Sequence, residues 1–184
     1  MDGIQIVRPT LDDAEPMLRL RSALFAEELI TSGCNPLRAL DHTSCWTAPE
    51  QIENHTDVLA DWLRSRRDFV RIVTQTGYTS SHIVGLFTGK FATPRRGINY
   101  ISTIQLHPSV RRKGVGTQLM HEFFTAATAN RPIELDVLEG NHPARAFYAS
   151  LGFTQISRSR AVIGRGPTGF SAIATLRLRL RRAE

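Results

Sequence analysis

The sequence predicts an α/β protein in which a mixed β-sheet carries helices on both of its faces. The first observation is the order of the predicted elements, which is one strand, two helices, three strands, a helix, a strand, a helix and two strands (βααβββαβαββ). Such an order favours a sheet covered on two sides. The second observation is the length of 184 residues, with 41% hydrophobic and 22% charged residues. We therefore expect a single domain that spans residues 1–184.

The first third of the chain predicts one strand and two helices. Residues 3–8 form the strand, and Thr10 is a candidate N-cap for a helix that continues to about residue 30, because a threonine oxygen can accept from the free N–H groups of a first turn. Residues 31–49 are polar and are predicted to be irregular. A second helix is expected over residues 50–67.

The rest of the chain alternates between apolar strands and amphipathic helices, separated by glycine-rich or proline-rich turns. Turns are expected at 77–81, 93–97 and 164–169. The predicted strands are 69–76, 82–91, 100–106, 133–137, 154–162 and 170–180, and the predicted helices are 117–127 and a segment that begins at Asn141.

Composition limits the classes of function. The net charge is +6, but the cations are scattered and do not alternate with aromatic residues, so we do not expect nucleic-acid binding. No apolar run approaches the roughly 20 residues of a membrane span, and the N-terminus lacks the pattern of a signal peptide. Cys34 and Cys45 lie outside any C-x-x-C motif. We expect a cytoplasmic protein with two free thiols and without a metal site.

The run Val110-Arg-Arg-Lys-Gly-Val-Gly-Thr117 predicts a phosphate-binding turn between a strand and a helix. Gly114 and Gly116 allow the backbone to approach a bulky anion. The following helix directs its free N–H groups and the positive end of its dipole toward the same point. We therefore expect a phosphorylated cofactor at this turn.

The letters of this turn distinguish among known phosphate loops. The P-loop pattern G-x-x-x-x-G-K-[ST] is absent, and Gly114-Val115-Gly116 lacks the third small residue of a dinucleotide-binding fingerprint. The pattern [QR]-x-x-G-x-[GA] does fit. Farther along, residues 141–153 fit N-x-x-A-x-x-F-Y-x-x-x-G-F. Both motifs, in this order, resemble those of the GCN5-related N-acetyltransferase (GNAT) family.

The resemblance covers about residues 99–153 in detail and the remaining chain only in the order of elements. It implies a mostly antiparallel, twisted sheet and acetyl-CoA as the cosubstrate. It also implies that the strand before the loop splays from its neighbour at a bulge near Leu106, and that the backbone amides of about 112–117 hold the pyrophosphate. The implied cofactor-binding residues are Ile104, Leu106, Arg111, Arg112, Lys113, Gly114, Val115, Gly116, Thr117, Asn141 and Arg145.

The helix that begins at Asn141 can be divided by its helical period. Asn141, Arg145 and Tyr148 share one stripe, whereas Phe147 lies on a separate apolar stripe. This spacing predicts that Phe147 is in the core and that Tyr148 lies on the polar side. The resemblance then assigns Tyr148 as the general acid for the leaving thiolate, and places Asn141 beside the cofactor. For Arg145, a cofactor contact and a surface position remain equally open.

The expected reaction is direct transfer of an acetyl group to a primary amine, which needs a base because free amines are mostly protonated at neutral pH. The candidates are Glu27, Glu28, Glu134 and Asp136, and each taken alone is more typical of a solvated carboxylate.

Several functional alternatives stay open at this point. The chain could instead be a non-catalytic acyl-CoA-binding or regulatory domain. The acceptor could be a small amine, an antibiotic, an amino acid, or a peptide or protein amine, and the acyl group could be longer. Trp46 and Phe25 are candidates for lining the acceptor pocket. The alternation over 175–182 indicates a strand that could be an edge protected by arginine, with a homodimer contact there as a weaker hypothesis.

Overall fold

The computed structural model describes residues 3–44, 47–76, 82–93, 97–127, 129–163 and 171–181. Some predictions fall on residues outside these ranges. They are the thiol of Cys45, the pocket-lining role of Trp46, the turns at 77–81 and 164–169, and residues 94–96 of the turn at 93–97. Within the described ranges, Cys34 is a free thiol.

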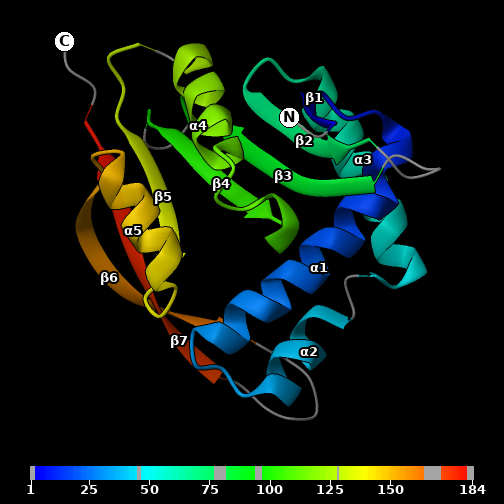
Figure 1. Ribbon diagram of the computed structural model, residues 1–184, viewed down its shortest axis with the longest axis horizontal. Coiled ribbons are helices and arrows are strands. Elements are labelled where there is room, and N and C mark those ends of the chain that lie inside the picture. The colour runs from blue at the N-terminus through cyan, green and yellow to red at the C-terminus, as the bar shows by residue number, and fades with distance from the viewer. Residues whose placement is uncertain are drawn as a thin grey trace.

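A seven-stranded sheet, in the order β1-β2-β3-β4-β5-β7-β6, forms the centre of the molecule (Figure 1). Neighbouring strands are antiparallel except for β4 and β5, which are parallel. The predicted mixed, mostly antiparallel sheet is therefore confirmed. The strands are β1 (Ile4–Val7), β2 (Asp68–Gln75), β3 (His82–Lys90), β4 (Asn99–Leu106), β5 (Ile133–Leu138), β6 (Thr154–Ile163) and β7 (Ser171–Leu180).

The helices lie close to their predicted positions, with one addition. They are α1 (Ala14–Thr31), α2 (Pro36–Ser44), α3 (Pro49–Arg64), α4 (Val115–Ala126) and α5 (His142–Ser150), with short 3₁₀ turns η1 (Leu11–Asp13) and η3 (Pro108–Val110). The prediction that residues 31–49 are irregular was wrong because α2 lies within them. Asn35 starts this helix by accepting from the Leu37 amide at 3.0 Å, and proline is favoured at the first helical position.

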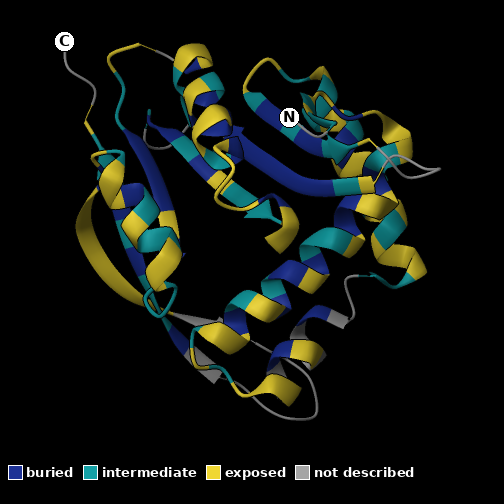
Figure 2. Ribbon diagram, viewed as in Figure 1, coloured by how far each residue is buried: buried dark blue, intermediate teal, exposed yellow. Residues whose placement is uncertain are grey.

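The helices cover both faces of the sheet, and β2 shows how the sequence divides them. Successive side chains of a strand point to opposite faces. Phe69 packs on Phe123 of α4 with ring centroids 5.4 Å apart. Val70, on the other face, belongs to a cluster with Met17 of α1 and Leu59 of α3. Because buried residues face both ways, β3 and β5 are buried over most of their length, whereas β4 is buried only at Asn99 and Ile101 (Figure 2).

The parallel pair β4–β5 is short, and this shapes the molecule. Its register covers only 99–101 against 133–135, and beyond Ile101 the strands diverge (Figure 1). The predicted splay is thus present. Its predicted origin at a bulge near Leu106 was wrong, because the irregularity in β4 lies at Ser102, where the β3 pairing skips one residue. The last residues of β4 therefore pair with β3 but not with β5, and an opening lies between them and β5.

Helix α1 runs from the β2–β3 side of the sheet to the β5–β7 side, across this opening (Figure 1). Its first turns pack through Ala14 and Met17 against β2. Its last turn packs through Leu29 in a cluster with Leu138 of β5 and Ile173 of β7. The stretch of α1 between these two contacts therefore passes the space between β4 and β5.

The C-terminal strand β7 is internal. It pairs with β5 on one side and β6 on the other, so the prediction of an arginine-protected edge over 175–182 was wrong, and the argument for a dimer contact at that edge is lost. The alternation itself is confirmed, since Leu176 and Leu178 are buried and Arg177 is half-buried. None of the helices in the described parts of the chain is long and apolar enough to cross a membrane.

Candidate active site

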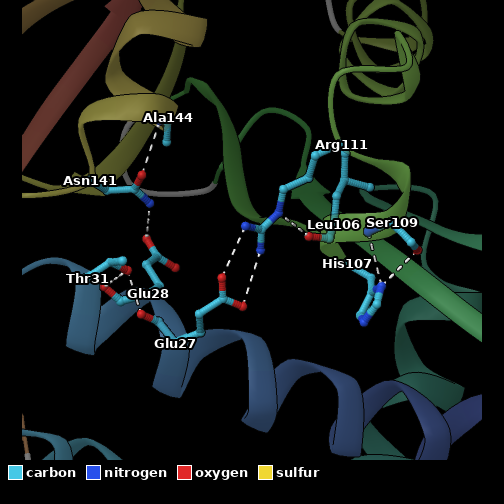
Figure 3. A network of polar contacts seen from close by, with 9 residues as sticks. All are labelled: Glu27, Glu28, Thr31, Leu106, His107, Ser109, Arg111, Asn141 and Ala144. Carbon is cyan, nitrogen blue, oxygen red and sulfur yellow. Dashed lines mark hydrogen bonds and ion pairs between the residues drawn. The ribbon is translucent and has the colours of Figure 1, made fainter.

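Side chains and backbone groups from four segments meet at the opening between β4 and β5 (Figure 3). They come from the last turns of α1, the end of β4, the turn that precedes α4, and the start of α5. These segments are far apart in the sequence, and the sheet topology brings them together. The opening therefore brings together most of the segments that carry predicted site residues.

The turn before α4 has the backbone of an anion-binding loop. Arg112 and Gly114 both have positive φ, at 62° and 81°, so successive amides point to the same side of the turn. The Gln118 amide donates to the carbonyl of Gly114 at 3.0 Å, and among the described residues the amides of 112–117 have no partner. The predicted set of free amides is present, and Val115 contributes through its backbone because its side chain is buried.

The two glycines of the loop have different surroundings. A Cβ atom at Gly116 would lie 3.4 Å from Phe147 of α5 and 3.6 Å from Leu106 of β4, whereas a Cβ atom at Gly114 would have nothing within 4 Å. Gly116 thus permits close packing of α4 on its neighbours. Gly114 supplies the left-handed turn and leaves open space in front of it, which suits a bulky ligand.

Arg111 is bound within the protein. Its Nε donates to the carbonyl of Leu106 at 2.8 Å, and its two terminal nitrogens lie 3.2 and 3.4 Å from the carboxylate oxygens of Glu27 on α1 (Figure 3). This side chain therefore ties the loop to β4 and α1. Arg112 and Lys113 are exposed and remain the two cations of the loop whose side chains are available to phosphate.

Asn141 caps α5, as predicted, and also reaches α1. Its side-chain oxygen accepts from the Ala144 amide at 3.1 Å, while its side-chain nitrogen donates to Glu28 at 3.0 Å (Figure 3). Arg145 donates to the backbone carbonyl of Glu139 at 2.9 Å and is half-buried. In the structure Arg145 stabilises the turn between β5 and α5.

The assignment of the α5 stripes to core and surface was wrong. Tyr148 is 6% exposed and belongs to the main core cluster, whereas Phe147 is half-buried and packs at its margin. Tyr148 packs its ring against Phe153, with centroids 5.8 Å apart. The polar stripe is partly buried because its members bind Glu28 and the carbonyl of Glu139, both of which are part-buried.

Glu28 is the carboxylate with the most unusual environment at the opening. Burial raises its pKa above the ordinary value, and hydrogen bonds from Asn141 and Gln105, with the charge of Arg111, partly oppose that rise. The pKa of Tyr148 is raised by burial and then by the negative charge of Glu28. The phenol and the carboxylate are therefore close enough to influence each other's proton affinity.

The other candidate bases are each paired with an arginine. Glu27 is engaged by Arg111. Asp136 is bound by Arg177 at 2.7 Å and accepts from Tyr100 at 2.8 Å. Glu134 was expected to be solvated, which was wrong, because it is 1% exposed and bound by Arg179. Each of these acids has an arginine as its partner.

Two other side chains are relevant to the opening. Gln105 of β4 was not predicted, because it lies between Ile104 and Leu106, whose apolar side chains are half-buried and pack against the main core. The available signal was a polar residue between two apolar residues of a strand. Phe25, the other candidate for the acceptor pocket, packs against the cluster around Leu29.

The chain matches the family model described as "Acetyltransferase (GNAT) family" over residues 38–153. This range includes both sequence motifs, the splayed strands and helices α3 to α5, and it covers more than half of the chain. No curated protein matches the chain by sequence.

Solved structures of low sequence identity share the fold. NAA60 of Arabidopsis thaliana, solved with a bisubstrate analogue, is 14% identical, with 98% of this chain and 99% of that chain covered and a TM-score of 0.68. PaiA N-acetyltransferase of Thermoplasma acidophilum, solved with coenzyme A, is 14% identical, with 97% and 99% covered and a TM-score of 0.66. YncA of Salmonella typhimurium, described as a putative acetyltransferase with acetyl-CoA as its cofactor, is 12% identical, with 100% and 96% covered and a TM-score of 0.65. By its matched residues and its fold, the chain belongs to the acetyltransferase (GNAT) family.

Proposed function

We propose that the protein is an acetyl-CoA-dependent N-acetyltransferase that acts on a primary amine, with Tyr148 as the general acid. The proposal rests on the chemical groups that lie at the opening between β4 and β5. The free amides of 112–117 belong to the loop on one side of it. On the other side lies Glu28, whose negative charge raises the pKa of Tyr148. A loop that suits phosphate and a phenol that keeps its proton are thus both associated with this opening.

The residues of the loop fit the pyrophosphate of coenzyme A. Free amides at a helix start favour an anion, the space in front of Gly114 admits one, and Arg112 and Lys113 add positive charge without an internal partner among the described residues. Two relatives of the same fold were solved with coenzyme A and with acetyl-CoA. The backbone groups of β4 after Ile101, released from β5, are available to the pantetheine arm.

Acetyl-CoA would supply an activated acetyl group, and the side chains of this chain would manage the protons. Tyr148 is buried and its pKa is raised, so its hydroxyl keeps its proton at neutral pH. A thiolate of ordinary pKa near ~8.5 is the group that must be protonated as it leaves, and a positioned acid typically contributes about 10²–10⁴ in rate. Tyr148 would donate to that sulfur.

The negative charge at the opening favours an amine as the acceptor. Among the described residues, Glu28 forms no ion pair with an arginine, whereas Glu27, Glu134 and Asp136 each do. A carboxylate of this kind attracts an ammonium group and repels anionic acceptors. One relative, NAA60, was solved with a bisubstrate analogue, and a peptide amine is therefore among the acceptors to test first.

The experiment is an acetyl-transfer assay on the purified protein with acetyl-CoA and three amines. They are spermidine, a peptide with a free N-terminus and no lysine, and an N-terminally blocked peptide with one lysine. Release of free thiol and the mass of the product are measured together. The proposal predicts transfer to at least one amine and tight, saturable binding of acetyl-CoA. Binding without any transfer would contradict the proposal and favour the regulatory alternative.

A further inference from the structure

We infer that Glu28 is the general base of the reaction, and that Gln105 beside it accepts a hydrogen bond from the acceptor amine and orients it. The inference rests on the proposed function, because it assigns roles within the same opening. It identifies the recognised group as the ammonium group of a primary amine.

The first support is the position of Glu28. It projects from α1 at the point where this helix crosses the opening, and groups of three other segments surround it: Asn141 of α5 at 3.0 Å, Gln105 of β4, and Arg111 of the loop through its charge. Arg111 directs its nitrogens to Glu27 instead. Glu28 is therefore held in place by neutral amides, which fix its orientation while leaving its charge only partly balanced.

The second support is an orphaned oxygen. The side-chain Oε1 of Gln105 is buried and has no hydrogen-bond partner among the described residues. A buried acceptor without a donor is costly, and such groups need an explanation. An ammonium group carries three N–H donors and can serve Gln105 and Glu28 together, whereas an alcohol or an anionic acceptor cannot serve both equally well.

The third support is the effect that protonation of Glu28 has on the pKa of Tyr148. The ionisable groups that face it are Arg111 from the loop, Tyr148 from α5, and Glu27 beside it on α1. Burial raises the pKa of Glu28 above its ordinary value, which makes it a stronger base than a solvated glutamate. Once Glu28 is protonated, its charge no longer raises the pKa of Tyr148, so Tyr148 becomes the stronger acid when the thiolate leaves.

In the proposed step, Glu28 takes one proton from the ammonium group, and the neutral nitrogen forms a bond to the acetyl carbon. The carbon–sulfur bond breaks, and the sulfur takes the proton of the Tyr148 hydroxyl. The second proton lost by the nitrogen restores that hydroxyl, and Glu28 releases its proton to solvent. The products are the acetylated amine, coenzyme A and one free proton.

The test compares Glu28→Gln with Glu28→Asp, and uses Glu15→Gln as the matched control. Glu15 lies on the same helix, is exposed, and pairs with Arg19 at 2.6 Å. Glutamine keeps the size of the side chain and an oxygen for Asn141, but it cannot take a proton. The rates of acetyl transfer to the three amines are measured from about pH 6 to pH 9, and acetyl-CoA binding by calorimetry confirms that each variant is folded.

The expected result is a loss of about 10²–10³ in kcat/KM for Glu28→Gln near pH 6 that shrinks about tenfold with each pH unit, because solvent then supplies the neutral amine. Glu28→Asp should retain part of the activity and the wild-type pH profile, and Glu15→Gln should match the wild type. A pH-independent loss would assign Glu28 a structural role, and an unchanged rate would remove it from the reaction; either outcome overturns the inference. A wild-type protein that acetylates no amine would instead contradict the proposed function itself.

Discussion

The two sides of strand β5 differ in whether their acidic side chains are paired with arginines. On the β7 side, Glu134 and Asp136 lie directly across from Arg179 and Arg177 in the antiparallel register, and each pair is joined by two hydrogen bonds. On the β4 side, the strands separate. Free amides and Glu28 there find no such partners within the described structure.

The difference separates structural carboxylates from reactive ones. On the β7 side, the pKa of Arg177 is raised mainly by its hydrogen bond with Asp136, so this pair stays ionised. On the β4 side, burial raises the pKa of Glu28 above its ordinary value. Four acids that were equivalent in the sequence thus take different roles according to the neighbour that the fold gives them.

The largest expected effect is on turnover, from removing one hydroxyl on the β4 side. Tyr148→Phe should lower kcat about 10²–10⁴-fold because the thiolate loses its proton donor, while the Kd for acetyl-CoA stays near the wild-type value. Tyr100→Phe is the control, since its hydroxyl binds Asp136 on the β7 side at 2.8 Å. Steady-state kinetics check both variants. An equal loss of kcat in the two variants would contradict the distinction between the β4 side and the β7 side.

The next effect is on cofactor affinity at the loop. Gly114→Asp should weaken acetyl-CoA binding on the order of tenfold more than Gly114→Asn, because aspartate adds a negative charge at the helix start. Both residues tolerate the left-handed backbone better than other side chains do, and a Cβ atom at Gly114 meets nothing within 4 Å, so the strain is matched. Calorimetry measures the two affinities. Equal values would place the phosphates elsewhere.

On the β7 side the expected effect is on stability. Arg179→Met leaves the carboxylate of Glu134, 1% exposed, without its arginine, and should lower the free energy of unfolding by about 3 kcal/mol. Arg177→Met should cost about 1 kcal/mol, because Asp136 is one-third exposed and keeps its bond from Tyr100. Urea unfolding gives both numbers. A larger loss for Arg177→Met would reverse the ranking of the two pairs.

The smallest expected effect is a pH-dependent difference in Tm between Glu28→Gln and the wild type. Because the pKa of Glu28 is higher in the folded protein than in the unfolded chain, the folded protein binds more protons between those two values, and its stability falls as pH rises through that window. Glu28→Gln should therefore have a higher Tm than the wild type above the window and an equal Tm below the ordinary glutamate pKa. Thermal unfolding across pH measures this. A variant less stable at neutral pH would contradict it.

Local features of the site could be predicted from the sequence. The positive-φ glycine at 114, the free amides after it and the cap made by Asn141 all follow from residue type and short spacing. The strand boundaries were within one or two residues for the same reason. The splay was implied by the family resemblance, but its position depends on a bulge at Ser102 that no local pattern indicates.

Features that depend on distant partners could not be predicted. Arg111 is tied to Glu27, 84 residues away, and Glu134 is buried because a strand 45 residues later provides Arg179. Helical period correctly grouped Asn141, Arg145 and Tyr148, but it cannot tell which stripe faces inward. In the folded protein this stripe faces α1, where Asn141 binds Glu28, a residue 113 positions away in the sequence.

The most direct test of the account is an ¹H–¹⁵N correlation spectrum of the labelled protein, titrated with acetyl-CoA. The account predicts the largest shifts at the amides of 112–117 and in the first turns of α5, with little change at 175–180 of β7. Shifts centred on β7, or none at saturating acetyl-CoA, would contradict the claim that the opening between β4 and β5 is the active site.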